Sequence, residues 1–174
     1  MSVINEVVEH PLTRAALAAR YRELCDDPYF ANIPGKIELD AWGRLLMSPA
    51  TTRHSVVQSR LNRRLDFPGG ECLVEVPIAT DAGLLVVDVA WMSTSFMAAH
   101  ASESPFLAAP ELCVEVASPS NSKRELREEI AAYLHAGAVE AWVVYPQSRR
   151  IERFGPSGAM TASAYPFDET GLLD

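Results

Sequence analysis

The chain has 174 residues, of which 48% are hydrophobic and 22% charged, values that suit one globular domain with a core of ordinary size. Its formal net charge of −8 argues against nucleic-acid binding over the whole surface, although it is compatible with a local basic face. No apolar run approaches the ~20 residues that cross a bilayer, and residues 1–6 lack the features of a signal peptide, so we expect a cytoplasmic protein without a membrane segment.

The predicted elements of the first half are, in chain order, a helix over residues 12–25, a hairpin of strands at 37–39 and 44–47, and a helix over 51–66. Apolar and β-branched runs then predict strands at 72–76 and 84–92, joined by a turn around 81–83. Residues 93–110 are expected to hold one short helix. In the second half we expect a strand around Glu115, a helix over 123–135 capped by Ser120 or Ser122, and strands at 140–145 and 150–154.

This order of elements predicts an α/β (α+β) fold in which helices flank a mixed central sheet. Residues 1–174 are expected to form a single domain, because no long linker or internal repeat divides them. Residues 1–34 are interpreted as an N-terminal helical extension and residues 155–174 as a weakly patterned tail. The three cysteines are odd in number and widely spaced, which argues against a disulfide framework or a structural zinc site.

Two apolar, strand-like runs each carry one acidic residue. Asp88 lies at the centre of the run 84–92, and Glu115 lies within the run 112–117. A buried carboxylate is costly unless it is paired, hydrogen-bonded or bound to a metal. We therefore expect a site for Mg²⁺ or Mn²⁺, which prefer oxygen ligands, at Asp88 and Glu115, with the backbone carbonyl of Val116 as a further ligand. The alternative is that these acids face solvent or an arginine at a sheet edge.

Two further residues are candidates for the same site. Glu38, in the first predicted hairpin, is either a third carboxylate for the ion or a solvated residue paired with Lys36 or Arg44. His54, near the start of the second predicted helix, contacts substrate, acts as a proton carrier, or forms only local hydrogen bonds.

Arginines follow one stripe of the predicted helix over 51–66. Arg53, Arg60 and Arg64 share this stripe by helical spacing, beside the apolar stripe of the same helix. The stripe is a candidate for contacting the phosphate backbone of a nucleic acid, whereas its ordinary interpretation is a solvated face. We group these arginines with His54 and Lys123 as the nucleic-acid-binding candidates.

Together these residues resemble the Uma branch of bacterial restriction-endonuclease-like proteins, within the PD-(D/E)XK nuclease superfamily. The resemblance spans roughly residues 37–155 and rests on the order and spacing of several short motifs. The motifs are Glu38 with Gly43 and Met47-Ser48-Pro49; His54 and Gln58; Val87-Asp88-Val89; Ala109-Pro110-Glu111-Leu112; Val114-Glu115-Val116 with Ser118-Pro119-Ser120; Tyr133; Gly137; and Trp142-Val143-Val144 with Pro146.

The resemblance implies a restriction-endonuclease-like mixed sheet and metal-dependent hydrolysis of DNA phosphodiester bonds. It implies that Asp88 and Glu115, with Glu38, hold one or two divalent ions, and that the protein forms a homodimer, as proteins of this fold often do. By the family pattern the segment after Gly155 is short, so a closing strand is expected to be missing.

The active-site lysine of the superfamily is absent from both of its usual positions. Ala117 stands two residues after Glu115, and Glu129 occupies the usual position on the following helix. Three interpretations stay open. Glu129 acts as a general base or an extra metal ligand, Lys123 or Arg127 supplies the positive charge, or the chain binds without cutting.

We therefore predict a metal-dependent endonuclease-like protein with Asp88, Glu115, Glu38 and Glu129 as its catalytic candidates. The alternative is a catalytically degenerate member of the same fold that acts as a nucleic-acid-binding or protein-interaction module. The missing lysine and the acidic net charge favour this alternative. The expected partners are DNA, a divalent metal and a second copy of the chain.

Overall fold

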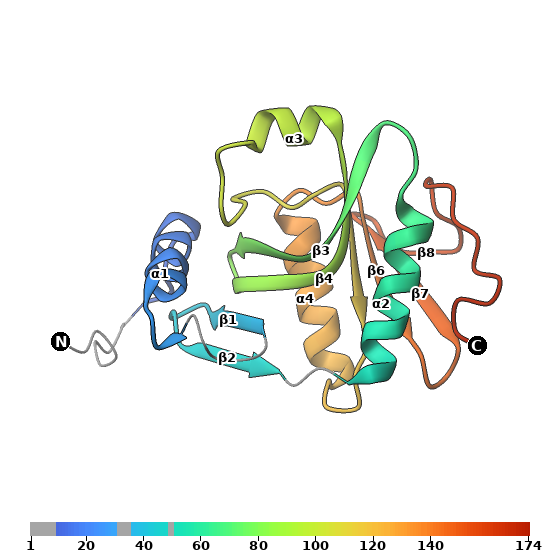
Figure 1. Ribbon diagram of the computed structural model, residues 1–174, viewed down its shortest axis with the longest axis horizontal. Coiled ribbons are helices and arrows are strands. Elements are labelled where there is room, and N and C mark those ends of the chain that lie inside the picture. Colours follow the sequence, from blue (N-terminus) through green and yellow to red (C-terminus); the bar gives the residue numbers. More distant parts are fainter. Residues whose placement is uncertain (1–9, 31–35, 49–50) are drawn as a thin grey trace.

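The computed structural model describes residues 10–30, 36–48 and 51–174. Within these ranges an eight-stranded sheet forms the centre of the molecule and four helices surround it (Figure 1). The helices are α1 (Arg14–Asp26), α2 (Thr52–Leu65), α3 (Thr94–His100) and α4 (Lys123–His135). The strands are β1 (Lys36–Asp40), β2 (Leu45–Ser48), β3 (Gly70–Thr80), β4 (Gly83–Ser93), β5 (Leu112–Val116), β6 (Glu140–Tyr145), β7 (Arg150–Gly155) and β8 (Gly158–Met160).

The sheet is mixed, as the order of elements predicts. Its strands follow the order β2-β1-β4-β5-β6-β7-β8, and β3 pairs along β4 outside this path. Strands β5 and β6 run parallel because α4 connects them, whereas the other named pairs are antiparallel. The predicted fold class, an α/β protein with a mixed sheet and flanking helices, is confirmed.

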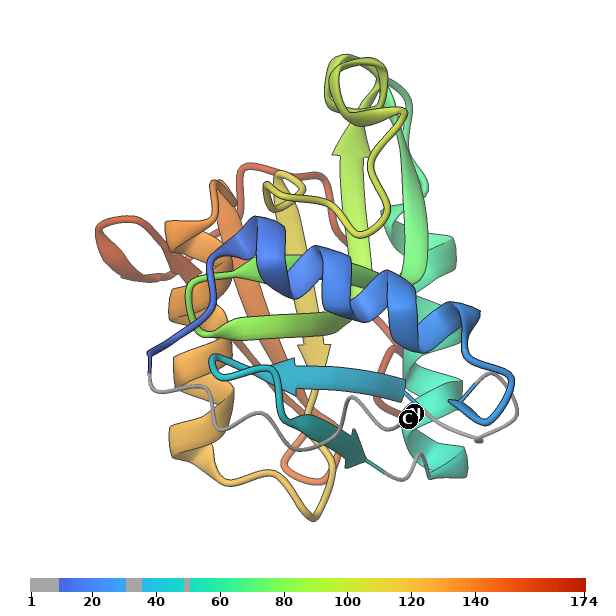
Figure 2. The same cartoon turned by 90° about the vertical axis from the view of Figure 1, so that its left-hand side faces the viewer.

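Helices α2 and α4 cover opposite faces of the central strands. Alternate residues of β5 enter different cores: Leu112 and Val114 pack with α2, whereas Cys113, which lies between them, packs with α4. Helix α1 covers a third apolar cluster, where Leu17 and Ala18 pack on β1 and on the first residues of β4. Figure 2 shows α1 lying across this part of the sheet.

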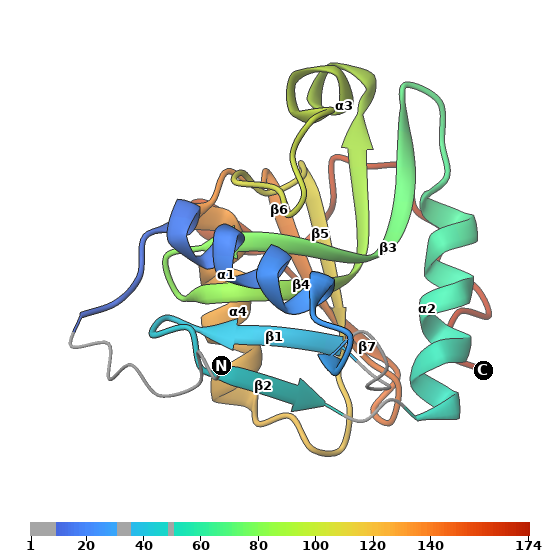
Figure 3. The ribbon, with the colours of Figure 1, turned by 60° about the vertical axis from the view of Figure 1, so that its left-hand side comes forward.

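The hairpin of β3 and β4 bends sharply in its middle (Figure 3). Strand alternation is interrupted at this bend, because Val87 belongs to the core with α4 while Val89, two residues further on, belongs to the core with α2. The register of β3 against β4 is the same on both sides of the bend, so no residue is inserted. Glu75, which stands opposite Asp88, instead adopts a φ of 55°. Asp88 therefore lies where β4 passes from one core to the other.

Most predicted elements are confirmed with small shifts at their ends. The largest shift is in β3, which continues past the predicted end at residue 76 as far as Thr80. Pro77 marks the point where the prediction stopped, since proline cannot donate a hydrogen bond to a neighbouring strand. Here Pro77 is paired to β4 and its carbonyl accepts a hydrogen bond from the backbone N–H of Phe106 at 3.1 Å. Among the strands in the described residues, β3 pairs only with β4, so a proline is tolerated.

The expectation of a missing closing strand is wrong. Strand β8 pairs with β7 in antiparallel fashion, with Gly155 opposite Gly158. Residues 156 and 157 make a tight turn, and Gly158 has a φ of +112°, which residues with a side chain rarely adopt. The strand is short, so its sequence carries little periodic signal.

The C-terminal tail lacks long regular elements but packs firmly on α2. Leu172 is fully buried in the core shared with α2. The guanidinium of Arg60 donates to the carbonyls of Leu172 and Asp174 at 3.0 and 2.9 Å, and that of Arg64 donates to the carbonyl of Thr170 at 2.7 Å. The weak patterning of the tail is explained by these contacts, which use its backbone oxygens.

Of the proposed helical extension, residues 1–9 and 31–34 lie outside the described residues, and α1 occupies most of the remainder. None of the helices in the described ranges has the length and apolar character that crossing a membrane requires.

Candidate metal centre

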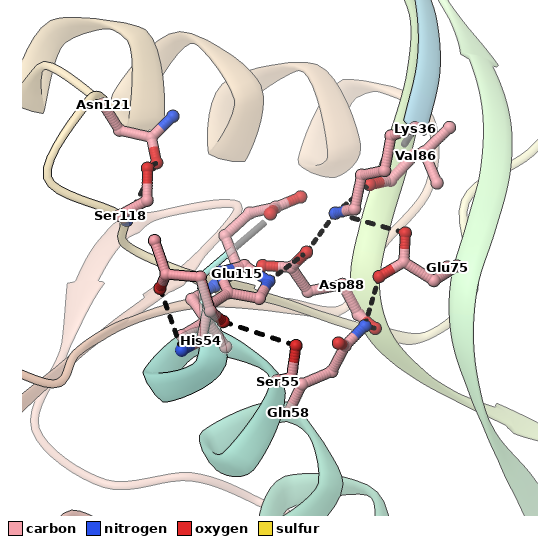
Figure 4. A network of polar contacts seen from close by, with 12 residues as sticks. Lys36, His54, Ser55, Gln58, Glu75, Val86, Asp88, Glu115, Ser118 and Asn121 are labelled. Carbon is pink, nitrogen blue, oxygen red and sulfur yellow. Dashed lines mark hydrogen bonds and ion pairs between the residues drawn. The ribbon is translucent and has the colours of Figure 1, made fainter. Parts of the chain in front are cut away.

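Asp88 lies at the bend of β4 with its side chain 1% exposed. The backbone N–H of Val116 on β5 donates to its Oδ2 at 2.7 Å. Its Oδ1 forms an ion pair with the ammonium of Lys36 and lies 3.1 Å from His54 Nε2 (Figure 4). Both carboxylate oxygens of this buried acid therefore have partners, as burial of a charge requires.

Asp88 is held in its ionised form. Burial opposes ionisation, but the contact with His54 and the positive charge of Lys36 outweigh it, so that the pKa of Asp88 is lowered from its ordinary value. An ionised, buried carboxylate is a group that can ligate a metal ion directly.

Glu115 reaches the same place from the neighbouring strand. It is buried, and its Oε1 accepts a hydrogen bond of 2.6 Å from the hydroxyl of Tyr133 on α4. Burial and the nearby charge of Asp88 raise the pKa of Glu115 well above its ordinary value. The side chains of Asp88 and Glu115 converge, as expected from their strands (Figure 4).

Two more acids contribute to the negative charge of this place. Glu38 on β1 accepts a hydrogen bond of 2.8 Å from the backbone N–H of Val86, and burial raises its pKa despite that bond. Burial, together with the charges of Glu38 and Asp88, raises the pKa of Glu129 on α4 to about 7. Because the mutual repulsion of these acids appears in their pKa values, the four catalytic candidates form one electrostatic cluster.

Lys36 is the cation at the centre of the cluster. Its Nζ pairs with Asp88, donates to the carbonyl of Val86 at 3.2 Å and lies 3.6 Å from Glu75 Oε2. Burial opposes its charge, but Asp88 and Glu115 raise the pKa of Lys36 above its ordinary value, so the ammonium stays charged.

His54, Glu75 and Asp88 form a group that could hold a metal ion. Each offers one ligand atom, and these atoms lie within 4.8 Å of one another. Gln58 on α2 positions two members of the group, because its Nε2 donates both to Glu75 Oε1 and, at 2.9 Å, to the backbone carbonyl of Asp88. Carboxylate oxygens and an imidazole nitrogen are suitable donors for a divalent cation.

Sequence reasoning missed Glu75 and Lys36, although each had a signal. Glu75 lies in a predicted strand that a short turn joins to the strand of Asp88. The observed pairing of Thr80 with Gly83 places Glu75 opposite Asp88. Lys36 lies two residues before Glu38 on β1, and residues two apart on a strand share a face. A site that includes Glu38 therefore has Lys36 beside it.

The structure places the basic candidates in different surroundings. Arg60 and Arg64 bind the tail, and the guanidinium of Arg53 donates to the carbonyl of Pro146 at 3.0 Å. His54 lies against Asp88, and Lys123 is exposed at the first turn of α4. Only His54 of this set contacts the acidic cluster in the contacts described, and a role for any of them in nucleic-acid binding stays a prediction.

Arg127 on α4, one of the two residues expected to supply the missing positive charge, contacts an aromatic ring. The guanidinium of Arg127 lies over the ring of Phe154, with its Cζ 5.9 Å from the ring centre. The acids and Lys36 are therefore the charged groups with which the site can bind an ion, orient a water molecule and bear charge near a phosphate.

Comparison with known proteins supports this description of the fold. No curated protein matches the chain. Among solved structures, a crystal structure titled as a putative nuclease belonging to DUF820 from Anabaena variabilis ATCC 29413 is similar, with a TM-score of 0.66 and 18% sequence identity. The similarity covers 94% of this chain and 98% of the other and shows a common fold. The family Uma2, described as "Putative restriction endonuclease", matches residues 18–172, and the chain therefore belongs to this family.

Proposed function

We propose that the protein is a metal-dependent endonuclease that hydrolyses DNA phosphodiester bonds and uses Mg²⁺ or Mn²⁺. The observation that carries the proposal is the convergence of the buried acids Asp88 and Glu115 from neighbouring strands, beside His54 and Glu75. Membership of the Uma2 family agrees with this chemistry.

In this proposal Asp88, Glu75 and His54 hold the cation. Strand β5 completes the site through the carboxylate of Glu115 or through the backbone carbonyl of Val116. A bound divalent ion supplies Lewis acidity, which lowers the pKa of a water molecule and offsets charge on the phosphate. Tyr133 orients Glu115 through its hydroxyl, and Gln58 orients Glu75. In this proposal Glu38 or Glu129 accepts a proton from the attacking water, directly or through a second water molecule.

The second candidate function is that of a degenerate member of the family that binds nucleic acid or protein without cutting. Two observations favour it. Both oxygens of Asp88 already have protein partners, and Arg60 and Arg64, which were candidates for phosphate contact, bind the tail.

The experiment is cleavage of supercoiled plasmid with Mn²⁺ or Mg²⁺, using the wild type and the variants Asp88→Asn and Glu115→Gln. Loss of one catalytic electrostatic group commonly costs about 10²–10³ in rate, and we expect at least the lower value for each variant. Glu71→Gln on β3 is the matched control, because this glutamate is exposed.

Two results decide between the candidates. Cleavage that survives in Glu71→Gln and disappears in Asp88→Asn supports the enzyme. Absence of cleavage by a well-folded wild type with either metal contradicts it and favours the degenerate member. The sedimentation of the wild type with and without DNA tests the homodimer that the family resemblance leads us to expect, in the same preparation.

A further inference from the structure

We propose that Lys36 is an internal competitor of the divalent cation: it occupies the Asp88 oxygen that the cation needs. When the cation binds, the ammonium moves toward the carbonyl of Val86 and Glu75 Oε2, and the other oxygen of Glu75 is left for the cation. This inference rests on the proposed metal use of the site. It assigns to Lys36 the role of controlling the affinity of the acidic site for the divalent cation.

The competition follows from the partners of the two Asp88 oxygens. Oδ2 is taken by the backbone N–H of Val116, which belongs to the paired strands and cannot move independently. Oδ1 is shared by Lys36 and His54. A cation ligated by Asp88 therefore binds at Oδ1, where it meets the ammonium of Lys36. Two cations cannot occupy that position together, because their charges repel in a buried place.

The ammonium has other partners within reach, so it can leave Asp88 without leaving the site. The carbonyl of Val86 already accepts from it at 3.2 Å, and Glu75 Oε2 lies 3.6 Å away. Figure 4 shows the ammonium between Asp88 and Glu75. A lysine suits such an exchange, since its compact charge sits on a flexible stem, whereas an arginine would bind a carboxylate through two parallel bonds.

Lysine is rare in this chain. Lys36 and Lys123 are the only two lysines among 15 basic residues, and the others are arginines. Lys36 lies within the cluster with its side chain 18% exposed, whereas Lys123 is exposed on α4. The two lysines thus form a natural pair of test and control positions.

The charge balance of the site explains why a divalent ion can displace the ammonium. Lys36 interacts electrostatically with each of the acids Glu38, Glu75, Asp88, Glu115 and Glu129. One positive charge cannot neutralise all five acids in their ionised form, and without a metal the raised pKa values of Glu38, Glu115 and Glu129 favour protonation instead. An ion with two charges gains more than one ammonium from the same acids once they ionise. Lys36 then lowers the affinity for the ion without abolishing it.

The first test is calorimetric titration of Mn²⁺ into the wild type, Lys36→Met and Lys123→Met. Removing the competitor should strengthen binding of Mn²⁺ by Lys36→Met about 10-fold or more, while Lys123→Met binds like the wild type. Lys36→Arg should bind no more tightly than the wild type because it retains a cation at Asp88. Asp88→Asn should bind at least 10-fold more weakly than the wild type.

Thermal unfolding measures metal binding even if Lys36→Met is less stable than the wild type. Without metal, Lys36→Met leaves Asp88 buried and without its main counter-charge, so its Tm should fall. Mn²⁺ at one fixed concentration should then raise the Tm of Lys36→Met by more than that of the wild type, because a tighter ligand stabilises more. An equal or smaller rise in Lys36→Met would overturn the proposal.

The second test observes the movement directly. Protein labelled with ¹⁵N and ¹³C in its two lysines should give two side-chain ammonium signals. Addition of Mg²⁺ should shift the signal of Lys36, which exchanges Asp88 for Glu75, and leave that of Lys123 unchanged. A Lys36 signal that is unaffected by saturating Mg²⁺ contradicts the exchange of partners.

These tests separate the inference from the proposed function. If Mn²⁺ binds wild type and Lys36→Met equally, competition is wrong while the nuclease proposal stands. If binding tightens in Lys36→Met but the wild type never cleaves plasmid, the competition is supported and catalysis fails. If neither protein binds Mn²⁺ or Mg²⁺, both the inference and the proposed function are overturned.

Discussion

At the scale of single residues, Glu129 shows how the cluster links ionisation to stability. Burial is the main cause of its raised pKa, and the charges of Glu38 and Asp88 add to it. A carboxyl whose pKa is higher in the folded than in the unfolded state binds its proton more tightly when folded. Its contribution to stability is complete below its ordinary pKa of 4.5 and is lost as the pH rises through about 7.

We predict that Glu129→Gln removes this pH dependence in the metal-free protein. At pH 5 the variant should be about as stable as the wild type, and at pH 8 it should be more stable by on the order of 2–3 kcal/mol, since glutamine cannot ionise. Urea unfolding at the two pH values measures the difference. Glu128→Gln, an exposed neighbour paired with Arg124, should show the same difference from wild type at both pH values. A stabilisation of Glu129→Gln that is equal at pH 5 and pH 8 contradicts the argument.

At the scale of elements, α4 begins where its sequence predicts and for the predicted reason. Ser122 accepts a hydrogen bond of 3.1 Å from the backbone N–H of Glu125, whose carboxylate accepts one of 2.8 Å from the N–H of Ser122. This capping box satisfies two N–H groups that a helix end otherwise leaves without partners. It also resolves the choice left open between Ser120 and Ser122, because the hydroxyl of Ser120 contacts Ser118 instead.

We predict that Ser122→Ala lowers the free energy of unfolding by about 1 kcal/mol, the usual effect of losing such a cap. Ser120→Ala should have a clearly smaller effect, because Ser120 does not cap the helix. Urea denaturation followed by circular dichroism compares the two. Equal losses in both variants would mean that the capping box does not stabilise α4.

Local patterns in the sequence were sufficient to predict helices and strands. They were insufficient to predict which of these elements contact one another. Periodicity and caps predicted α4 and the strands that carry Asp88 and Glu115, because these patterns depend on neighbours in the chain. The contact of Lys36 with Asp88 depends on β1 pairing beside β4, a long-range pairing that no local pattern contains. The change of face at Asp88 was equally hidden, since strict alternation assumes a straight strand.

At the scale of the whole molecule, the tail completes the core on the α2 face. Leu172 is fully buried with Val57, Leu61 and Leu65 of α2, although it lies only two residues from the end of the sequence. A buried leucine in a short, irregular segment could not be identified from sequence, since nothing periodic surrounds it. Its partner is a helix more than 100 residues earlier in the chain.

We predict that Leu172→Ala lowers the free energy of unfolding by about 2 kcal/mol or more, as expected for a cavity left by a buried leucine. Leu173→Ala should cost less, because Leu173 is only partly buried. Chemical denaturation measures both variants. Comparable losses would show that the tail is held mainly by its backbone contacts with Arg60 and Arg64.

The docking of the tail gives the protein an intrinsic optical signal. Two of its three tryptophans lie against tail residues: the ring centre of Trp91 is 5.5 Å from that of Tyr165, and that of Trp142 is 5.1 Å from that of Phe167. Release of the tail would expose both indoles to water and move their fluorescence to longer wavelength, whereas Trp42 is already 42% exposed. If a DNA duplex binds Arg60 and Arg64 in place of the tail carbonyls, the tryptophan fluorescence should therefore shift to longer wavelength. A duplex that binds elsewhere would leave the fluorescence unchanged.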